Sequence, residues 1–155
     1  MFEVILVPLD GSELAEQALP PALEIRSKFG SKLILVRSVE SLAQHMLQAP
    51  IIVEQPAAAA ATVELMEEVV ESEHDEATKY LQGLLRKSGE DVEAVVVEGN
   101  PADAISEFAK QRGVGLIAMS SHGRGGLGRL VFGSVADAIL RHSEVPVLLI
   151  RSKEA

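Results

Sequence analysis

The chain has 155 residues, the usual size of one domain, so we expect a single domain spanning residues 1–155. Apolar residues make up 47% of the chain and charged residues 24%, which is typical of a folded, soluble protein and excludes an intrinsically disordered one. The net charge of −9 argues against nucleic acid and membranes as partners, because phosphates and anionic lipids would be repelled.

The cysteine count and the hydropathy pattern indicate a compartment. The sequence contains no cysteine, which excludes disulfides, thiol nucleophiles and thiolate metal sites. Residues 1–8 lack the basic leader and long apolar stretch of a signal peptide, and no apolar run approaches the roughly 18 residues that span a bilayer. We therefore expect a cytoplasmic protein.

Five short runs of apolar and β-branched residues are predicted to be strands, and helical patterns separate them. The runs are residues 3–9, 32–39, 92–98, 116–119 and 145–150. Several are continuously apolar, as expected for parallel strands that helices cover on both faces. The alternation predicts an α/β fold with five parallel strands.

Two helical segments precede the third strand. After Ser12 the apolar spacing predicts a helix that ends near Phe29 and Gly30, with a kink or a restart at the proline pair 20–21. Residues 41–56 are expected to be a loop and residues 57–87 a long helix. Its acidic stretch, residues 71–76, includes a histidine, but a solvated charged face is favoured over a metal site, and we expect no metal.

The segment after the fourth run, residues 120–134, is the most informative part of the sequence. It contains five of the 12 glycines, and residues 109–136 carry four basic side chains and no acidic one. Glycines let backbone N–H groups turn toward an anion, and Ser134, followed by Asp137, is predicted to cap a helix whose positive end faces the same place. A phosphate cradle is favoured over an unspecialised surface loop.

Three common motifs give no alternative enzyme class. The G-x-G-x-x-G pattern at residues 123–128 is followed by only one further strand, so it does not open a dinucleotide-binding βαβ unit. No G-x-x-x-x-G-K-[ST] sequence occurs, so fast phosphoryl transfer with a P-loop lysine is not expected. No G-x-S-x-G elbow occurs, and the adjacent Ser121 and His122 do not make a nucleophile and base.

Two further turns follow strands at the edge where open α/β sheets bind ligands. Asp10 follows the first strand and is a candidate acceptor for ribose hydroxyls or an adenine amino group. Its structural alternative is to cap the following helix or to form a turn, and the two roles can coexist. The turn at residues 99–103 is a candidate border for a base, or a simple turn in which Pro101 begins a helix.

Taken together, these segments make the chain similar to the universal stress protein family. The resemblance covers nearly the whole length and rests on the opening strand that ends at residues 7–12, the turn at 99–102, the segment at 120–134 and the final strand at 145–150. The motif G-x2-G-x9-G-[ST] of the nucleotide-binding branch is matched by Gly123, Gly133 and Ser134, with Ser120 in place of its first glycine.

This resemblance implies a fold and a ligand. The fold is an open sheet with strand order 3-2-1-4-5 and helices on both faces, and the ligand is ATP, alone or with Mg²⁺, at the carboxyl ends of strands 1 and 4. Asp10 would hold the ribose or adenine, residues 38–39 and Gly99 would border the base, and Gly123, Gly133 and Ser134 would hold the phosphates. The full set of implied site residues is Pro8, Leu9, Asp10, Ser38, Val39, Gly99, Ser120, His122, Gly123, Arg124, Gly126, Gly133, Ser134 and Val135.

The resemblance also implies a role. We expect an ATP-binding stress-response protein, with at most weak ATPase activity, whose nucleotide occupancy alters the binding of a partner protein. A homodimer paired through the last strand is expected, because an apolar strand at a bare sheet edge would invite aggregation. The alternatives are a dimeric interaction module that binds no nucleotide, and an enzyme that uses ATP to modify a small substrate.

Overall fold

The computed structural model describes residues 2–48, 56–89, 91–121 and 133–151. They form one five-stranded sheet in the order β3-β2-β1-β4-β5, in which all neighbouring pairs are parallel. The strands are β1 (Val4–Pro8), β2 (Lys32–Val39), β3 (Val92–Glu98), β4 (Leu116–Ser121) and β5 (Val147–Arg151). The expected fold class and strand order are confirmed.

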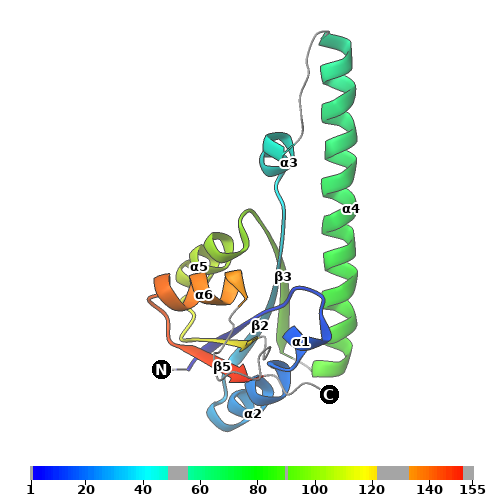
Figure 1. Cartoon of the computed structure of the whole chain (residues 1–155). Coiled ribbons are helices and arrows are strands. Elements are labelled where there is room, and N and C mark those ends of the chain that lie inside the picture. The colour runs from blue at the N-terminus through cyan, green and yellow to red at the C-terminus, as the bar shows by residue number, and fades with distance from the viewer. Residues whose placement is uncertain (1, 49–55, 90, 122–132, 152–155) are drawn as a thin grey trace, which may run out of the picture.

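Helices cover both faces of this sheet (Figure 1). On one face pack α2 (Leu19–Phe29) and the end of α4 (Pro56–Ser88), against side chains such as Ile5, Val7 and Leu35. On the other face pack α5 (Pro101–Gln111) and α6 (Ser134–His142), against Leu6 and Ile117. Successive side chains of a strand point to opposite faces, so the continuously apolar strands supply both cores.

The first crossover helix is interrupted, as the proline pair predicted. A short α1 (Glu13–Glu16) ends at Gln17, and α2 begins at Leu19, so both prolines fall in the first turn of the second helix. Proline is tolerated there because the first backbone N–H groups of a helix have no partner inside the helix. Gly30, the C-cap of α2, has φ 66°, as expected for a glycine that ends a helix.

The connection between β2 and β3 corrects one expectation. Residues 57–87 lie in the long helix α4, as predicted, but α3 (Leu42–Gln48) occupies part of the segment expected to be a loop. Its start is fixed locally, because the Ser41 hydroxyl accepts from the backbone N–H of Gln44 while the Gln44 side chain accepts from the backbone N–H of Ser41. This reciprocal pair is a capping box that the composition of the segment concealed.

The long helix α4 rises well beyond the sheet, with α3 beside its upper part (Figure 1). The acidic stretch of residues 71–76 is exposed, as predicted, except for the partly buried Glu73. Within the residues that the structure describes, no helix is both long enough and apolar enough to cross a membrane.

Candidate functional site

A cavity of about 350 Å³ opens at the carboxyl ends of β1 and β4. The chain leaves β1 toward β2 and leaves β4 toward β5, so the strand order diverges between these two central strands. Open α/β sheets bind ligands at such a point. Its volume lies within the roughly 300–1,000 Å³ usual for small-molecule sites. The lining consists of Pro8, Leu9, Asp10, Ser12, Ala15, Arg37, Ser38, Pro101, Ile105, Met119, Ser120, Gly133, Ser134, Val135 and Ala136.

The loop after β1 presents a carboxylate to this cavity. The backbone N–H and the hydroxyl of Ser12 both donate to Asp10 Oδ1, at 2.9 and 2.6 Å, and Ser12 Oγ also caps α1 by accepting from Ala15 N. Gly11 has φ +90°, a conformation that glycine adopts without strain. One Asp10 oxygen is therefore fixed by the turn, while Oδ2 has no hydrogen-bond partner among the described residues.

The capping role considered for Asp10 is wrong, because another residue of the loop caps the first helix. Asp10 forms the turn, whereas Ser12 is the residue that caps the helix. The division leaves Asp10 Oδ2 available to a ligand that donates hydrogen bonds.

Ser120 lies on β4 and lines the same cavity. Its hydroxyl donates to the Leu14 carbonyl of α1 at 2.5 Å and so ties α1 to the end of β4. Ser120 has strand geometry, and the only non-glycine residue with positive φ in the described part of the chain is Asp91. The serine therefore fits its position without backbone strain.

The start of α6 lies on the same cavity and corrects a second expectation. The N-cap is Gly133 rather than Ser134, which is the first helical residue, and Gly133 has no side chain with which to cap the helix. Asp137 does not complete a capping box, because its carboxylate accepts from Arg141 at 2.8 Å. No described residue caps the first backbone N–H groups of α6, so within the described part of the chain they are available to a ligand at the positive end of the helix dipole.

Arg37 supplies the positive charge of the cavity. Its guanidinium lies over the Tyr80 ring at 5.2 Å and is 3.9 Å from the Glu76 carboxylate. Tyr80 in turn donates to Glu16 at 3.0 Å. Burial and this hydrogen bond raise the pKa of Tyr80 far above its usual range, so the phenol stays neutral and forms a fixed support for the arginine.

The β3–α5 turn closes the remaining side. Gly99 has φ +124° and donates to the Val39 carbonyl at 3.0 Å, and Asn100 caps α5 by accepting from Ala102 N. Pro101 is the first residue of α5, as predicted, and lines the cavity. Val39 is buried, and neither Val39 nor Gly99 is among the residues that line the cavity, so the structure does not bring these two predicted site residues into it.

The cavity brings together eight of the residues singled out in the sequence. These are Pro8, Leu9, Asp10, Ser38, Ser120, Gly133, Ser134 and Val135. Four others, His122, Gly123, Arg124 and Gly126, lie outside the described residues.

Sequence reasoning missed several lining residues, of which Arg37 is the most important. It is a charged residue within the otherwise mostly apolar strand β2, directly before Ser38. A charge in a strand covered on both faces is itself a signal, because burying it unpaired is costly. The apolar wall of Ala15, Ile105, Met119 and Ala136 carried no such signal, because these residues have the spacing of ordinary core positions.

The arrangement is that of an α/β protein with a small-molecule site at the edge of its sheet. An open parallel sheet carries a mostly apolar cavity at its switch point, with a carboxylate on its lining and, on another part, a helix N-terminus that no described residue caps. Such a cavity suits a ligand with an apolar ring, hydroxyl donors and an anionic group.

Comparison with known proteins gives the family. The family model described as Universal stress protein family matches residues 1–151, so the chain belongs to this family. Universal stress protein MJ0531 of Methanocaldococcus jannaschii is 28% identical over 151 residues, which cover 97% of this chain and 83% of the relative. Universal stress protein MJ0577 of the same organism is 28% identical over 159 residues, covering 100% of this chain and 98% of the relative.

Solved structures agree with the fold. The structure of MJ0577 superposes with a TM-score of 0.75 at 26% identity and covers 100% of this chain and 99% of its own. A universal stress protein in complex with cAMP has a TM-score of 0.68 at 23% identity, covering 97% and 98%. A family protein from Arabidopsis thaliana with AMP bound has a TM-score of 0.62 at 21% identity, covering 97% and 92%.

Proposed function

We propose that this protein binds an adenine nucleotide, with ATP as the working ligand, in the cavity between β1, β4 and α6. The observation that carries the proposal is the placement of the partner-free oxygen of Asp10 and the uncapped start of α6 on one cavity. The complexes of two family structures with cAMP and with AMP support the choice of an adenine nucleotide.

The phosphates are assigned to the α6 end of the cavity. Backbone N–H groups at a helix N-terminus attract anions, and Gly133 adds no side chain that would obstruct their approach. The Ser134 hydroxyl has no hydrogen-bond partner among the described residues and is free to donate to a phosphate oxygen. Gly123, Arg124 and Gly126 would complete this cradle, with or without Mg²⁺.

The nucleoside is assigned to the β1 and β2 side. Asp10 Oδ2 would accept from the ribose hydroxyls, because a carboxylate is a strong acceptor for such donors. Ser38 and the apolar side chains of Pro8 and Leu9 would border the base, and the guanidinium of Arg37 would lie at the boundary between base and ribose.

The proposed role is regulatory. Nucleotide occupancy would change the glycine-rich segment or the dimer and so alter partner binding in the cytoplasm. Any ATP hydrolysis would be slow, because the sequence contains no P-loop lysine to stabilise charge on the transferred phosphate. Turnover at tens per second, a rate typical of competent phosphoryl-transfer enzymes, would contradict this role.

The proposed dimer pairs two copies through β5. This strand is at the edge of the sheet, bonded only to β4 among the described strands, and its residues Val147–Ile150 are apolar and half-buried. A parallel sheet edge of this kind is a template for pairing with another strand.

A thermal-shift titration tests the nucleotide proposal. Protein stripped of bound nucleotide is heated with ATP, AMP or inorganic triphosphate at about 100 times the dissociation constant, where binding adds roughly 2.7 kcal/mol of stability. For a chain of this size that corresponds to roughly 5–10 °C. We expect ATP to raise the midpoint more than either fragment. No shift with any ligand would favour the dimeric interaction module, and formation of a modified metabolite from ATP would favour the transferase.

A further inference from the structure

The upper part of α4, together with α3, forms a helical arm that the nucleotide proposal does not use. The arm comprises residues 42–48 of α3 and 56–76 of α4, and it stands clear of the sheet (Figure 1). The described core residues on α4 begin only at Ala77, and none comes from the arm. The arm is therefore anchored at one end and exposed along most of its length.

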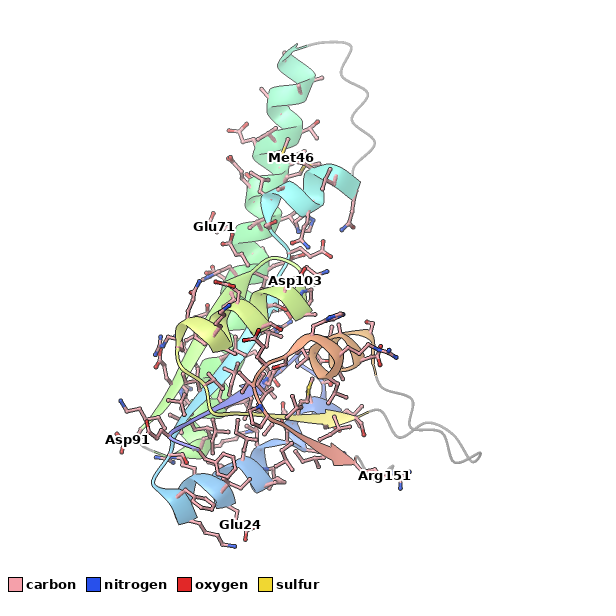
Figure 2. The ribbon with its side chains drawn as sticks, turned by 90° about the vertical axis from the view of Figure 1, so that its left-hand side faces the viewer. Glu24, Met46, Glu71, Asp91, Asp103 and Arg151 are labelled. Atoms are coloured by element: carbon pink, nitrogen blue, oxygen red, sulfur yellow. The ribbon has the colours of Figure 1, made fainter. Side chains whose placement is uncertain are left out.

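Large apolar side chains are exposed on this arm. Leu47 is 87% exposed, Leu65 63% and Val69 47%. Leu65 and Val69, with Thr62 and Met66, line a shallow groove of about 370 Å³ along α4, which His45 and Gln48 of α3 complete. Figure 2 shows Met46 in the region between the two helices. Contiguous exposed apolar surface of this kind is typical of an interaction site.

The same arm is strongly acidic. The sequence contains no lysine or arginine between Arg37 and Lys79. Seven carboxylates lie on α4 within this interval: Glu64, Glu67, Glu68, Glu71, Glu73, Asp75 and Glu76. Among the described residues only two of them lie within 4.0 Å of a cationic or histidine nitrogen, Glu73 at 3.3 Å from His45 and Glu76 at 3.9 Å from Arg37.

The apolar and acidic surfaces adjoin along one face of the helix. Leu65, Val69, Ser72 and Glu76 follow one another at intervals of three or four residues and so share a face. Ser72 and Glu76 also belong to a second hollow, lined further by Glu68, Glu71, Asp75 and Lys79. From Val69 to Glu76 the helix rises about 10 Å, or two turns.

We propose that the arm is a docking surface for a basic amphipathic helix of a partner protein. The partner's apolar side chains fill the groove at Leu65 and Val69, and its lysine or arginine side chains lie about 10 Å further along, over the carboxylates near Glu71 and Asp75. Charge selects this occupant, because a second acidic arm or an anionic membrane would be repelled. The surface does not include the nucleotide cavity, so this inference stands apart from the proposed function.

A designed peptide tests this surface. The probe is a fluorescent model helix of about 18 residues, five turns, with two leucines and then three lysines at helical spacing on one face and neutral helix formers elsewhere. A scrambled peptide of identical composition and a peptide with glutamate in place of lysine are the controls. Binding is measured by fluorescence anisotropy with the intact protein at two salt concentrations, with and without ATP.

Two variants alter the two halves of the surface separately. Leu65→Ser with Val69→Ser removes the apolar side chains, and the triple variant E68Q/E71Q/D75N removes three charges. The matched control E24Q/E107Q/E144Q makes the same change in net charge on exposed side chains elsewhere. Circular dichroism and the melting temperature verify the fold of each variant.

We expect each arm variant to weaken binding of the ordered peptide at least about tenfold, and the control variant to leave it within about twofold. The charge variant should also reduce the salt dependence of binding. Equal binding of the scrambled or glutamate peptide would overturn the proposal, as would equal losses in the arm and control variants. Self-association that the Leu65 and Val69 substitutions abolish, or adhesion to anionic vesicles, would instead assign the arm to a second copy or to a membrane.

Discussion

Replacing Gly133 by aspartate should abolish nucleotide binding without harming the fold. Gly133 is the N-cap of α6 with φ −59° and ψ 154°, a backbone conformation that any L-residue adopts. Aspartate is a favoured N-cap residue and differs from glycine there by only a few tenths of a kcal/mol. The free energy of unfolding should therefore stay the same or rise slightly.

The loss of binding follows from charge. If a carboxylate at the helix start and a bound phosphate are separated by about 4 Å, two unit charges repel by about 4 kcal/mol at an effective dielectric constant of 20. Screening by salt reduces this energy, so we expect the dissociation constant for ATP to rise by about a hundredfold to a thousandfold. Isothermal titration calorimetry measures it directly.

Gly133→Asn is the matched control. Asparagine has nearly the same shape and is an equally good cap, but it carries no charge, so the difference between the two variants isolates electrostatics from obstruction. We expect the asparagine variant to bind ATP at least about tenfold more tightly than the aspartate variant. Equal dissociation constants in two folded variants would refute the assignment of the phosphates to the start of α6.

Three further predictions follow from single side chains. Asp10→Ala should weaken ATP binding about tenfold or more but hardly affect inorganic triphosphate in calorimetry, because the proposed contact of this carboxylate is to the ribose. Matching losses for both ligands would exclude that role. Folding raises the pKa of Tyr80, so the stability that this phenol contributes is complete below about pH 10 and is lost as the pH rises further. The melting temperature should therefore fall more steeply above that pH in the native protein than in Tyr80→Phe. Parallel melting curves of the two proteins would contradict this role of Tyr80. Leu81→Ala should lower the free energy of unfolding, measured by urea denaturation, by about 2–5 kcal/mol, because the side chain is 1% exposed. A loss below about 1 kcal/mol would mean that this end of α4 does not pack into the hydrophobic core.

The sequence predicted the sheet well because its evidence is local. Continuous apolar strands and intervening helical periods identify an α/β fold, and the turns at Gly11, Gly30 and Gly99 need positive φ, which glycine tolerates. The strand order came from the family resemblance rather than from the strands themselves. Helix α3 was missed because its start depends on one reciprocal pair, Ser41 with Gln44, within a segment of mixed polarity.

Half of the candidate site was open to prediction and half was not. Asp10, Ser120 and Gly133 stand at strand ends or helix starts, where sequence position alone indicates the ligand-binding edge. Arg37 and Met119 reach the cavity from within strands, and only the pairing of β1 with β2 and β4 brings them to one place. The cap of α6 was assigned one residue late because Ser134 and Asp137 have the spacing of a capping box, whereas the structure begins the helix at Ser134 and pairs Asp137 with Arg141.

An amide NMR titration of nitrogen-labelled protein tests the central claim most directly. ATP is added to stripped protein, and inorganic triphosphate is added to a second sample. We predict that the amide signals of Gly133, Ser134 and Val135 shift with both ligands, while those of Asp10 and Ser38 shift only with ATP. Saturating ATP that leaves the signals of α6 and of Asp10 unchanged would contradict a nucleotide site in this cavity.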